Sequence, residues 1–376
     1  MLSGMNVIRD LVGVDFPLFA FSHCRDVVAA VSRAGGFGVL GGSMFTPESL
    51  EAELRWVDDH VDGKPYGVDI LVPENQYDTG GMTIAQLAEH LPTEHREFLA
   101  QLLKDYDVDL RLDGGASDVA PATSPEVGHE LMDVAFKHPI KLIANALGIA
   151  PDWMIERGKS EGVAVAALVG AKEHAVRQVN AGVDILVAQG TEAGGHCGEV
   201  STLVVVPEVV RTVREIRDVP VLAAGGIMTG AQMAGCMAMG AAGVWTGSVW
   251  LATPESEVSE TFRQKLVAAS SRDTIRSKAR TGKPSRQLRS AWHEAWEGPN
   301  SPGSLPLPLM SILSTPAFSS IDRAADAGNP KARELVSYWV GQGVGLIDSV
   351  KTCAQVVQDF MSEYAESVER LPTLVE

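Results

Sequence analysis

The sequence predicts an α/β fold, a (β/α)8 or TIM barrel with a smaller C-terminal helical lobe. Three observations support this prediction. Short apolar runs recur along the first 250 residues, most of them are followed by an amphipathic segment, and the rhythm changes after Pro254. Alternation of strands and helices implies parallel strands joined by right-handed crossovers. Eight such units match a closed barrel better than an open sheet.

Eight apolar runs have the length of a strand that is buried on both faces, and several carry β-branched residues. They are PLFAF (17–21), FGVLGG (37–42), YGVDILV (66–72), KLIANALG (141–148), VAVAALVG (163–170), DILVAQG (184–190), VPVLAAGG (219–226) and AGVWTGS (242–248). Helical stretches are expected between the later runs, at 171–182 and 206–218. Residues 107–115 compete for a strand, but the turn-rich polar residues that follow indicate an insertion at about 107–130.

The chain after the eighth run is predicted to form a mainly helical lobe. Residues 1–253 would form the barrel, and residues 254–376 would form the lobe packed on it. ETFRQKLVAASS, NPKARELVSYWV and IDSVKTCAQVVQDFMSEYAESVERL look helical, and a Pro-rich loop is expected over 298–316. The i, i+4 pair Trp292 and Trp296 indicates packing between lobe and barrel.

Composition and charge favour a cytoplasmic globular protein. The 31 basic and 48 acidic residues leave a formal charge of −17, and such a surface repels nucleic acid. Four scattered cysteines favour a reducing compartment over a zinc site or a disulfide framework. We recognise no signal peptide, no apolar stretch of 18 residues and no carboxylate cluster, so export, membrane insertion and a divalent metal are not expected. The oligomeric state stays open, a homo-oligomer included.

Two glycine turns follow the seventh and eighth runs, at the strand ends where the working site of such a barrel lies. The first turn is Gly225-Gly226, and the second is Thr246-Gly247-Ser248. Glycine lets the backbone approach a ligand closely, and exposed N–H groups with a helix N-terminus behind them favour an anion. We therefore predict that the two turns together hold one phosphate. Tight turns that serve packing alone are the alternative.

A histidine follows the sixth run in the segment AQGTEAGGHCG, residues 188–198. Gln189 ends the expected strand, Gly194-Gly195 allows a tight loop, and His196 comes next. Imidazole can exchange a proton near neutral pH, and it can donate a hydrogen bond to an anionic substrate. His196 is therefore a candidate catalytic residue. A histidine that is exposed, or that only braces the loop, is the alternative.

These segments resemble the nitronate monooxygenase family, formerly called 2-nitropropane dioxygenases. The resemblance is carried by AQGTEAGGHCG, PVLAAGGI and GAAGVWTGS, and it extends to VVAAVSRAGGFGVLGG, YGVDILVP and YWVGQGVGLI, over about residues 15–350. It implies an FMN-dependent oxidoreductase with the flavin at the C-terminal mouth of the barrel. It also implies a small-molecule substrate, an alkyl nitronate, with O2 as the second substrate.

The resemblance implies a role for each residue at a matching position. His196 would be the catalytic base that removes the α-proton of a nitroalkane. The other matching residues would contact the flavin, its phosphate or its ring system: Ala20, Phe21, Ser22, Asp69, Gln189, Gly194, Gly195, Gly225, Gly226, Trp245, Thr246, Gly247 and Ser248.

The sequence departs from the family pattern in places that bear on the site. The family usually has Asn where this chain has Asp69; an amide can donate a hydrogen bond, whereas an ionised carboxylate can only accept one. The first loop usually reads APM, but here it is AFSHCRD, which brings His23 and Cys24 towards the expected ring. Cys24 is either a reactive thiol or a packed, inert one. The basic island at 279–290, with Lys283 and Arg286, either attracts an anionic substrate or forms a solvated turn.

Two other functions remain open at this point. The same barrel and glycine turns would suit an NAD(P)H-dependent flavin reductase that acts on an enoyl or other acyl-CoA or acyl-carrier thioester, because fold does not fix the reaction. A non-catalytic flavin-binding protein would keep the phosphate turns, but it would have no use for His196.

Overall fold

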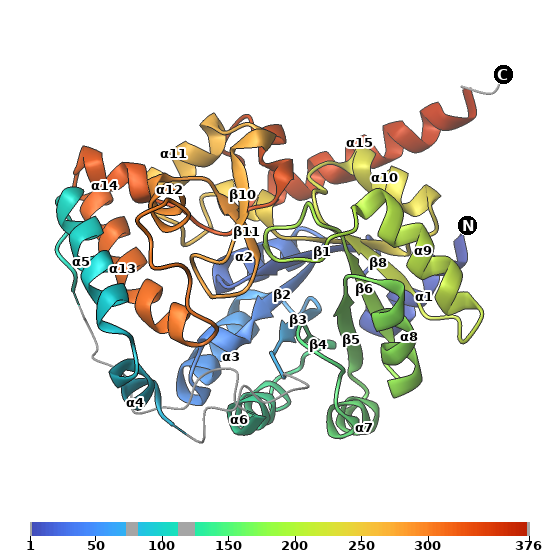
Figure 1. The fold of residues 1–376 in the computed structure, drawn as a ribbon. Helices are drawn as coiled ribbons and strands as arrows, with labels where there is room; N and C mark the ends of the chain where they lie inside the picture. Colours follow the sequence, from blue (N-terminus) through green and yellow to red (C-terminus); the bar gives the residue numbers. More distant parts are fainter. Residues whose placement is uncertain (1, 73–81, 112–124, 374–376) are drawn as a thin grey trace.

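The structure is a computed structural model that describes residues 2–72, 82–111 and 125–373. Eight parallel strands close into the predicted barrel in the order β1-β2-β3-β4-β5-β6-β8-β9 (Figure 1). Their bounds are β1 (Leu18–Ser22), β2 (Phe37–Gly41), β3 (Tyr66–Asp69), β4 (Leu142–Asn145), β5 (Ala164–Val169), β6 (Ile185–Gln189), β8 (Val221–Ala224) and β9 (Gly243–Thr246). Each strand coincides with one of the eight apolar runs, which confirms the predicted fold class.

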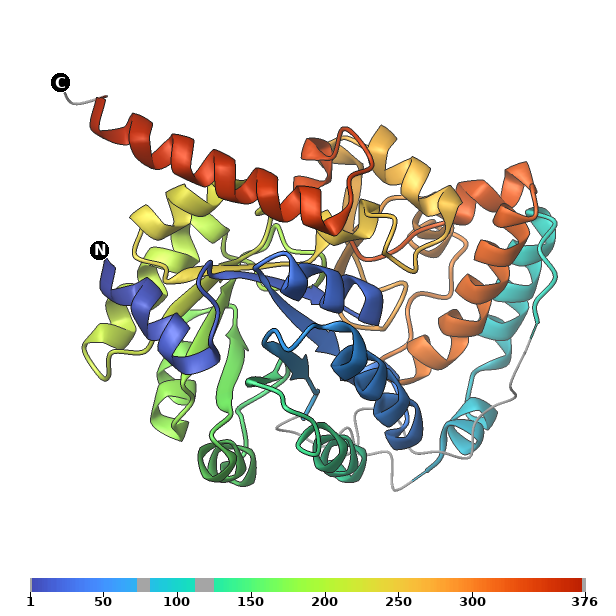
Figure 2. The ribbon, with the colours of Figure 1, turned by 180° about the vertical axis from the view of Figure 1, so that it is seen from behind.

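Helices cover the outside of the barrel. They are α2 (Arg25–Arg33), α3 (Pro47–His60), α6 (Pro125–Ala135), α7 (Asp152–Glu161), α8 (Lys172–Ala181), α9 (Thr202–Arg214) and α10 (Gly230–Ala238). The long C-terminal helix α15 (Cys353–Thr373) runs across α10 and α2 (Figure 2). A Cβ on Gly230 would lie 2.1 Å from the carbonyl oxygen of Phe360, so the missing side chain allows α10 and α15 to pack closely.

Alternate residues of the strands fill the interior of the barrel. Phe19, Phe37, Leu142, Val187 and Trp245 belong to one buried cluster there. Helix α1 (Leu2–Val12) adds Ile8 and Val12 to the same cluster. Because these side chains pack against the interior layer, α1 closes the N-terminal end of the barrel, a role that the sequence did not indicate.

A second hydrophobic cluster lies beside the barrel, where Figures 1 and 2 show α5 next to α13. It contains Trp292 and Trp296, whose ring centroids are 5.6 Å apart. Its helices are α4 (Ile84–Glu89), α5 (Thr93–Asp105), α11 (Glu260–Ala268), α12 (Ala291–Trp296), α13 (Leu309–Asp326) and α14 (Pro330–Leu335). The cluster thus joins residues from both sides of the proposed boundary at 253/254, and the division into two domains stays a prediction.

The region after residue 254 also contains two strands, β10 (Thr274–Ser277) and β11 (Ser285–Leu288). They form an antiparallel sheet in the order β10-β11-β7, in which β7 (Gly195–His196) comes from the loop after β6. Short 3-10 helices complete the fold: η1 (Gly42–Met44), η2 (Ser248–Ala252), η3 (Ser271–Asp273) and η4 (Gln342–Leu346). The small sheet connects the C-terminal region directly to the strand-end loop that carries the candidate histidine.

Several predicted boundaries were wrong, including the end of α14 at Leu335 and the start of α15 at Cys353. Helix α9 begins at Thr202 and continues through Pro207 to Arg214, four residues earlier than predicted. Helix α13 begins at Leu309, inside the predicted Pro-rich loop, because Met310, Leu313 and Ala317 are spaced along one buried face. The predicted insertion at 107–130 lies mostly outside the described residues, and residues 107–111 form no strand.

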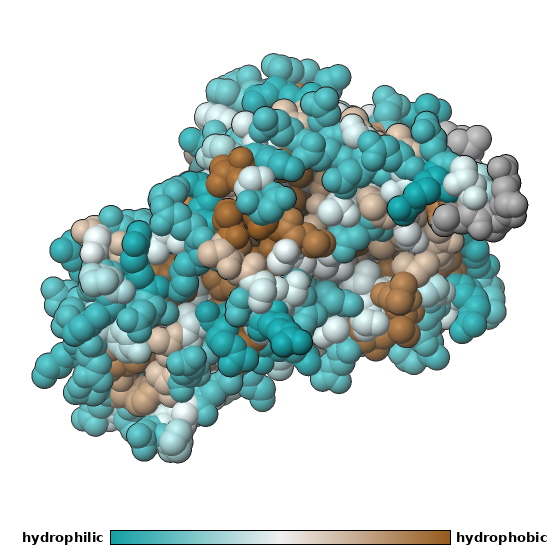
Figure 3. Space-filling model, turned by 90° about the horizontal axis from the view of Figure 1, so that it is seen from above, coloured by the Kyte–Doolittle hydropathy of each residue, from teal (hydrophilic) through white to brown (hydrophobic). Residues whose placement is uncertain are grey.

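The surface seen from above is mostly hydrophilic, with a compact hydrophobic patch near its middle (Figure 3). Within the described ranges, no helix has both the length and the apolar character needed to cross a membrane.

Candidate functional site

The C-terminal ends of the barrel strands form a ring that we call the mouth. Side chains alternate along a strand, so neighbouring positions fix which residues face inward. Tyr66 and Val68 belong to the cluster outside the barrel, so Asp69 points inside. Val187 belongs to the interior cluster, which makes Gln189 the next inward side chain on β6. Asp69 and Gln189, both predicted site residues, therefore face the interior at the mouth.

Asp69 is a buried carboxylate with an unsatisfied oxygen. Asp69 is 3% exposed, and none of the described residues forms a hydrogen bond with its Oδ2 atom. Burial raises the pKa of Asp69 to about 7 because water no longer stabilises the charge. A buried polar atom without a partner is costly and calls for an explanation, and a ligand at the mouth would provide one.

The end of β1 contributes aromatic rings to the mouth. Phe21 lies 6.3 Å from Trp245 and 5.2 Å from His23, measured between ring centroids. His23 Nδ1 lies 3.1 Å from the carbonyl oxygen of Gly41, and burial lowers the pKa of His23. Ala20 belongs to the outer cluster, so only its backbone can reach a ligand inside the barrel.

The loop after β1 is held by the cysteine that the sequence singled out. The hydroxyl oxygen of Ser22 accepts a hydrogen bond from the Cys24 amide at 3.1 Å. The Cys24 thiol donates to the carbonyl oxygen of Glu255 at 3.1 Å. Burial raises the pKa of the Cys24 thiol. Because a thiolate is the reactive form, these contacts support the packed, inert alternative.

The two glycine turns lie at the ends of adjacent strands, as predicted. Gly225 and Gly226 have φ angles of 106° and 71°, which residues other than glycine rarely adopt. A Cβ on Gly225 would lie 2.8 Å from Thr202 Oγ1, whereas a Cβ on Gly247 would meet no atom within 4 Å. Gly225 is thus required by the fold, while the space beside Gly247 is open.

The side chains beside Gly247 are engaged by the protein itself. Thr246 Oγ1 donates a hydrogen bond to the carbonyl oxygen of Phe19 at 2.9 Å. Ser248 Oγ accepts one from the amide of Gly341 at 2.8 Å. The first N–H groups of η2 have no partner within the helix, as at any helix start. An anion at this turn would therefore be bound mainly by backbone amides.

One part of the predicted phosphate site is already used inside the protein. The amide of Gly230, in the first turn of α10, donates a hydrogen bond to Glu363 Oε2 of α15 at 2.8 Å. A carboxylate is favoured at a helix N-terminus by the helix dipole. An anion at the turn after β8 could therefore bind to the glycine backbone of the turn. The N-terminus of α10 behind this turn is already occupied in part by the Glu363 carboxylate.

His196 lies on β7 and is bonded to the C-terminal region. Its Nε2 atom is 2.9 Å from Thr281 Oγ1, and β7 pairs with β11 at Ser285. Thr281 Oγ1 also donates to the carbonyl oxygen of Lys283 at 3.2 Å. Thr281 Oγ1 thus lies within hydrogen-bonding distance of both His196 Nε2 and the carbonyl oxygen of Lys283, and in the tautomer that carries its proton on Nε2 the imidazole leaves Nδ1 free to accept a proton. His196 remains exposed, yet the desolvation caused by surrounding atoms lowers the pKa of the imidazole.

The loop that carries His196 is packed under a segment from the far end of the chain. A Cβ on Gly194 would lie 2.8 Å from the amide of Gly341, whereas one on Gly195 would meet nothing within 4 Å. The amide of Gln342 donates to the carbonyl oxygen of Glu192 at 2.8 Å. Gly194 therefore serves the contact between these two segments, and only its backbone is available to a ligand.

The basic island is mostly buried rather than a solvated turn, so that alternative was wrong. Arg286 Nε donates a hydrogen bond to the carbonyl oxygen of Thr191 at 2.9 Å, and Arg280 Nη1 donates to that of Ser337 at 3.0 Å. Both guanidinium groups are buried, whereas Lys283 is half-buried beside the His196–Thr281 contact. Arg286 therefore stabilises the loop after β6, whereas Arg280 stabilises the segment that contains Ser337.

Two contributors to the site were missed as candidates. Thr281 carries no distinctive pattern of its own, and only the contact across the small sheet shows its relation to His196. The segment 341–343 was noticed for its resemblance but was given no role. Its contacts with Glu192 and Ser248 bring it over the turns after β6 and β9. The repeated glycines were the available signal, because close backbone contact needs them.

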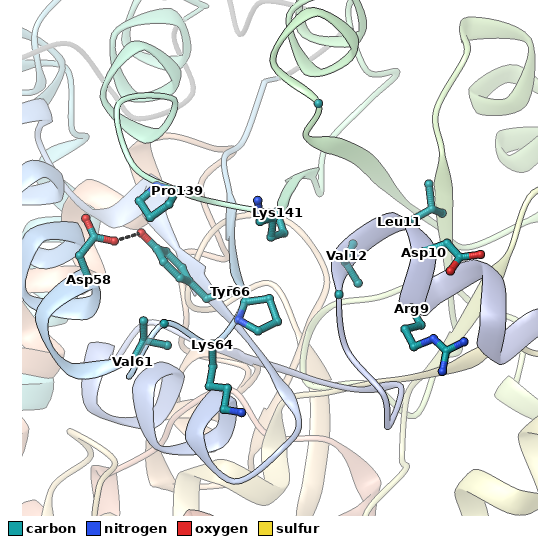
Figure 4. A pocket seen from close by; sticks show the side chains of 14 residues that line it. Arg9, Asp10, Leu11, Val12, Asp58, Val61, Lys64, Tyr66, Pro139 and Lys141 are labelled. Carbon is teal, nitrogen blue, oxygen red and sulfur yellow. Dashed lines mark hydrogen bonds between the residues drawn. The ribbon is translucent and has the colours of Figure 1, made fainter.

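A separate hollow of about 540 Å3 lies at the opposite end of the barrel (Figure 4). It is lined by residues at the starts of β3 and β4, including Tyr66 and Lys141. Tyr66 Oη donates to Asp58 Oδ1 at 2.6 Å, and burial raises the pKa of Tyr66. The labelled side chains of Arg9, Lys64 and Lys141 point in different directions in Figure 4 and form no common binding point. The hollow is therefore distinct from the mouth.

The fold and the mouth define a barrel enzyme, and comparison with known proteins gives its class. The model of the nitronate monooxygenase family matches residues 10–363. The chain therefore belongs to the nitronate monooxygenase family and is a flavin-dependent oxidoreductase.

Individual proteins agree with this assignment. A Mycobacterium tuberculosis protein named as a monooxygenase is 48% identical over 98% of this chain and 99% of its own length. The nitroalkane oxidase from Streptomyces ansochromogenes has 25% identity and a TM-score of 0.76, over 97% of this chain and 100% of its own. The enoyl reductase domain of MlnA from Bacillus amyloliquefaciens has 14% identity and a TM-score of 0.65, over 98% of both chains, and shares the fold.

Proposed function

We propose that the protein is an FMN-dependent nitronate monooxygenase that oxidises alkyl nitronates with O2 at the mouth of the barrel. The observation that carries the proposal is the pair of adjacent turns. One is constrained by glycines at positive φ, and the other leaves open space beside Gly247. Side-chain-free backbone at the ends of the last two strands suits a phosphate in a barrel of this kind.

The residues at the mouth fit a flavin mononucleotide. The amides at Gly226, Gly247 and Ser248 would bind the phosphate, and the cluster of Phe21 and Trp245 would flank the ring system. The unsatisfied Oδ2 of Asp69 gives the ring a polar partner inside the barrel. When bound, FMN supplies the redox chemistry, accepting an electron from the nitronate and passing it to O2.

The protein's own contribution to catalysis is proton transfer by His196. An imidazole with Nε2–H bonded to Thr281 presents Nδ1 as the acceptor for the α-proton of a nitroalkane. The lowered pKa keeps His196 neutral, and thus ready to accept a proton, at neutral pH. The imidazolium formed after transfer keeps the Nε2–H bond to Thr281.

The His196→Asn variant tests this role. We expect kcat/KM for a neutral nitroalkane to fall by at least about a hundredfold, the usual contribution of a positioned base. Turnover of the preformed nitronate, which needs no proton removal, should change by less than about threefold. Equal losses on both substrates would contradict the role of His196 as a base.

A second candidate is an NAD(P)H-dependent reductase of an enoyl or acyl thioester. The half-buried Lys283 favours it, because this residue follows Thr281, the partner of His196, by two positions, and a cation near the site suits a larger anionic substrate. Anaerobic mixing with NADH or NADPH distinguishes the two functions. Rapid bleaching of the flavin absorbance supports the reductase, whereas an unchanged spectrum that bleaches on addition of a nitronate supports the monooxygenase.

A further inference from the structure

We propose that Asp69 binds the flavin as a neutral carboxylic acid, so that cofactor uptake requires one proton at the mouth of the barrel. The inference rests on the proposed function, because it takes the ligand at the mouth to be FMN. It goes further by stating that the buried carboxyl of Asp69, at the C-terminal end of β3, is protonated and donates a hydrogen bond to the flavin.

The geometry leaves this carboxyl without a partner. Asp69 faces the interior, is 3% exposed, and has an Oδ2 atom that no described residue contacts through a hydrogen bond. Burial alone accounts for the raised pKa, with no cation among the described residues offsetting it. An ionised carboxylate in such a position is strongly disfavoured unless a cation or several donors surround it.

The neighbouring elements do not supply such donors. On β2, Gly41 pairs with Asp69, and its carbonyl faces His23, whose lowered pKa keeps the ring neutral. On β4, Ala144 pairs with Asp69, and the following Asn145 is engaged with the backbone of Val72 through both atoms of its amide. His23 thus contacts the residue that pairs with Asp69, and its lowered pKa means that it supplies no compensating charge.

The protonation state decides which flavin atoms can be bound. A neutral acid donates one hydrogen bond, and a carboxylate accepts only. Flavin carbonyl oxygens and the ring nitrogens that carry no hydrogen are acceptors, so they pair with the acid and repel the carboxylate. If the flavin binds only to protein in which Asp69 is protonated, the flavin dissociation constant rises about tenfold per pH unit above the pKa of Asp69 in the free protein. A carboxylate accepting from a flavin N–H would give the opposite slope.

The test is a titration of the apoprotein with riboflavin and with FMN between pH 6 and 9, followed by flavin fluorescence. Riboflavin removes the phosphate, whose own second ionisation falls near pH 6. For the wild type we expect the riboflavin dissociation constant to rise by about tenfold per pH unit above pH 7. Asp69→Asn, which stays neutral and can donate, should show a flat profile. Asp15→Asn, at a side chain that is 90% exposed, should keep the wild-type slope.

A second measurement needs no variant. Calorimetric titration of the wild type with riboflavin at pH 8, in two buffers of different ionisation enthalpy, should show uptake of close to one proton per flavin. A flat wild-type pH profile, a profile that tightens with pH, or no proton uptake would each overturn the role of Asp69 and leave the flavin site intact. Failure of FMN to bind at any pH would instead refute the proposed function.

Discussion

At the scale of single residues, the chemistry depends on how two buried hydrogen-bonding groups are satisfied. Thr281 Oγ1 contacts both His196 Nε2 and the carbonyl oxygen of Lys283, and the proposed base is the tautomer in which Nε2–H donates to Thr281. Asp69, by contrast, has a carboxyl oxygen that no described residue contacts through a hydrogen bond. The His196–Thr281 contact is formed in the protein without a ligand, whereas Asp69 gains a hydrogen-bond partner for Oδ2 only when a ligand binds.

Replacing Thr281 tests the first of these statements. Thr281→Val keeps the shape but removes the oxygen that accepts from Nε2–H. We expect kcat/KM for a neutral nitroalkane to fall about tenfold, the worth of roughly 1.4 kcal/mol. The acid limb of its pH profile should move to lower pH, because the imidazolium loses a partner. Thr281→Ser should restore the wild-type profile; a Val variant with unchanged rate and profile would show that Thr281 only packs.

The pH dependence of stability tests the state of Asp69 in the absence of flavin. Its pKa is raised from 3.8 to about 7 on folding, so the folded state binds the proton more tightly than the unfolded state. The contribution of Asp69 to the free energy of unfolding is fully present below pH 3.8 and is lost as the pH rises through 7. Asp69→Asn should therefore gain stability over the wild type between pH 4 and pH 8, by up to about 4 kcal/mol. Urea unfolding of the apoprotein at both pH values measures the difference; an equal offset at both would contradict the raised pKa.

Site residues could be predicted from the sequence where their neighbours in the chain define their role, but not where a contact with a distant segment does. His196 and the glycine turns were recognisable because their neighbours in the chain define them. Thr281 was not, since it lies 85 residues from His196 in the chain and meets it only across the small sheet. The burial of Asp69 follows from strand alternation, but its unsatisfied oxygen depends on three neighbouring strands.

At the scale of elements, the two glycine turns have different physical reasons for lacking side chains. Gly225→Ala would bring a Cβ to 2.8 Å from Thr202 Oγ1 at a φ of 106°. Gly247→Ala would meet no atom within 4 Å. We expect the first variant to lose about 1–3 kcal/mol of unfolding free energy, and the second to lose less than about 0.5 kcal/mol. Thermal or urea unfolding without flavin measures both, and a destabilised Gly247→Ala variant would mean that this glycine serves the fold.

Whether an element could be predicted from the sequence depends on how that element is stabilised. The eight barrel strands are buried on both faces, so each appears as an apolar run. Strands β7, β10 and β11 are short and rich in polar residues, and no run marks them. The prolines over 298–316 predict a loop, yet helix α13 begins inside that range and contains Pro316, because the buried spacing of Met310 and Leu313 determines the helix.

At the scale of the whole molecule, two of the contacts between the C-terminal region and the barrel join segments that lie far apart in the chain. The small sheet holds the loop of His196, and α15 packs across α10 and α2. Phe360, on α15, is 1% exposed within the outer barrel cluster. The sequence predicted a barrel with a helical region after it, but the way that region packs depends on contacts between segments far apart in the chain.

Truncating Phe360 tests the second of these contacts. Phe360→Ala should cost about 3–5 kcal/mol of unfolding free energy, because it removes a large buried ring. Glu366→Ala, an exposed site on the same helix, should change stability by less than about 0.5 kcal/mol. Chemical denaturation of both variants compares them; a small effect at Phe360 would show that α15 is not part of the cooperative core.

The central claim is that backbone at the ends of β8 and β9 binds the phosphate of FMN. The most direct measurement is the ratio of the riboflavin to the FMN dissociation constant, obtained by fluorescence titration for the wild type and for Gly247→Ala. The account predicts a ratio above about 100 for the wild type, at least about 3 kcal/mol from the phosphate. It predicts a fall of tenfold or more in the variant, whose added methyl group occupies the open space. Equal ratios in the two proteins, or a wild-type ratio near one, would contradict it.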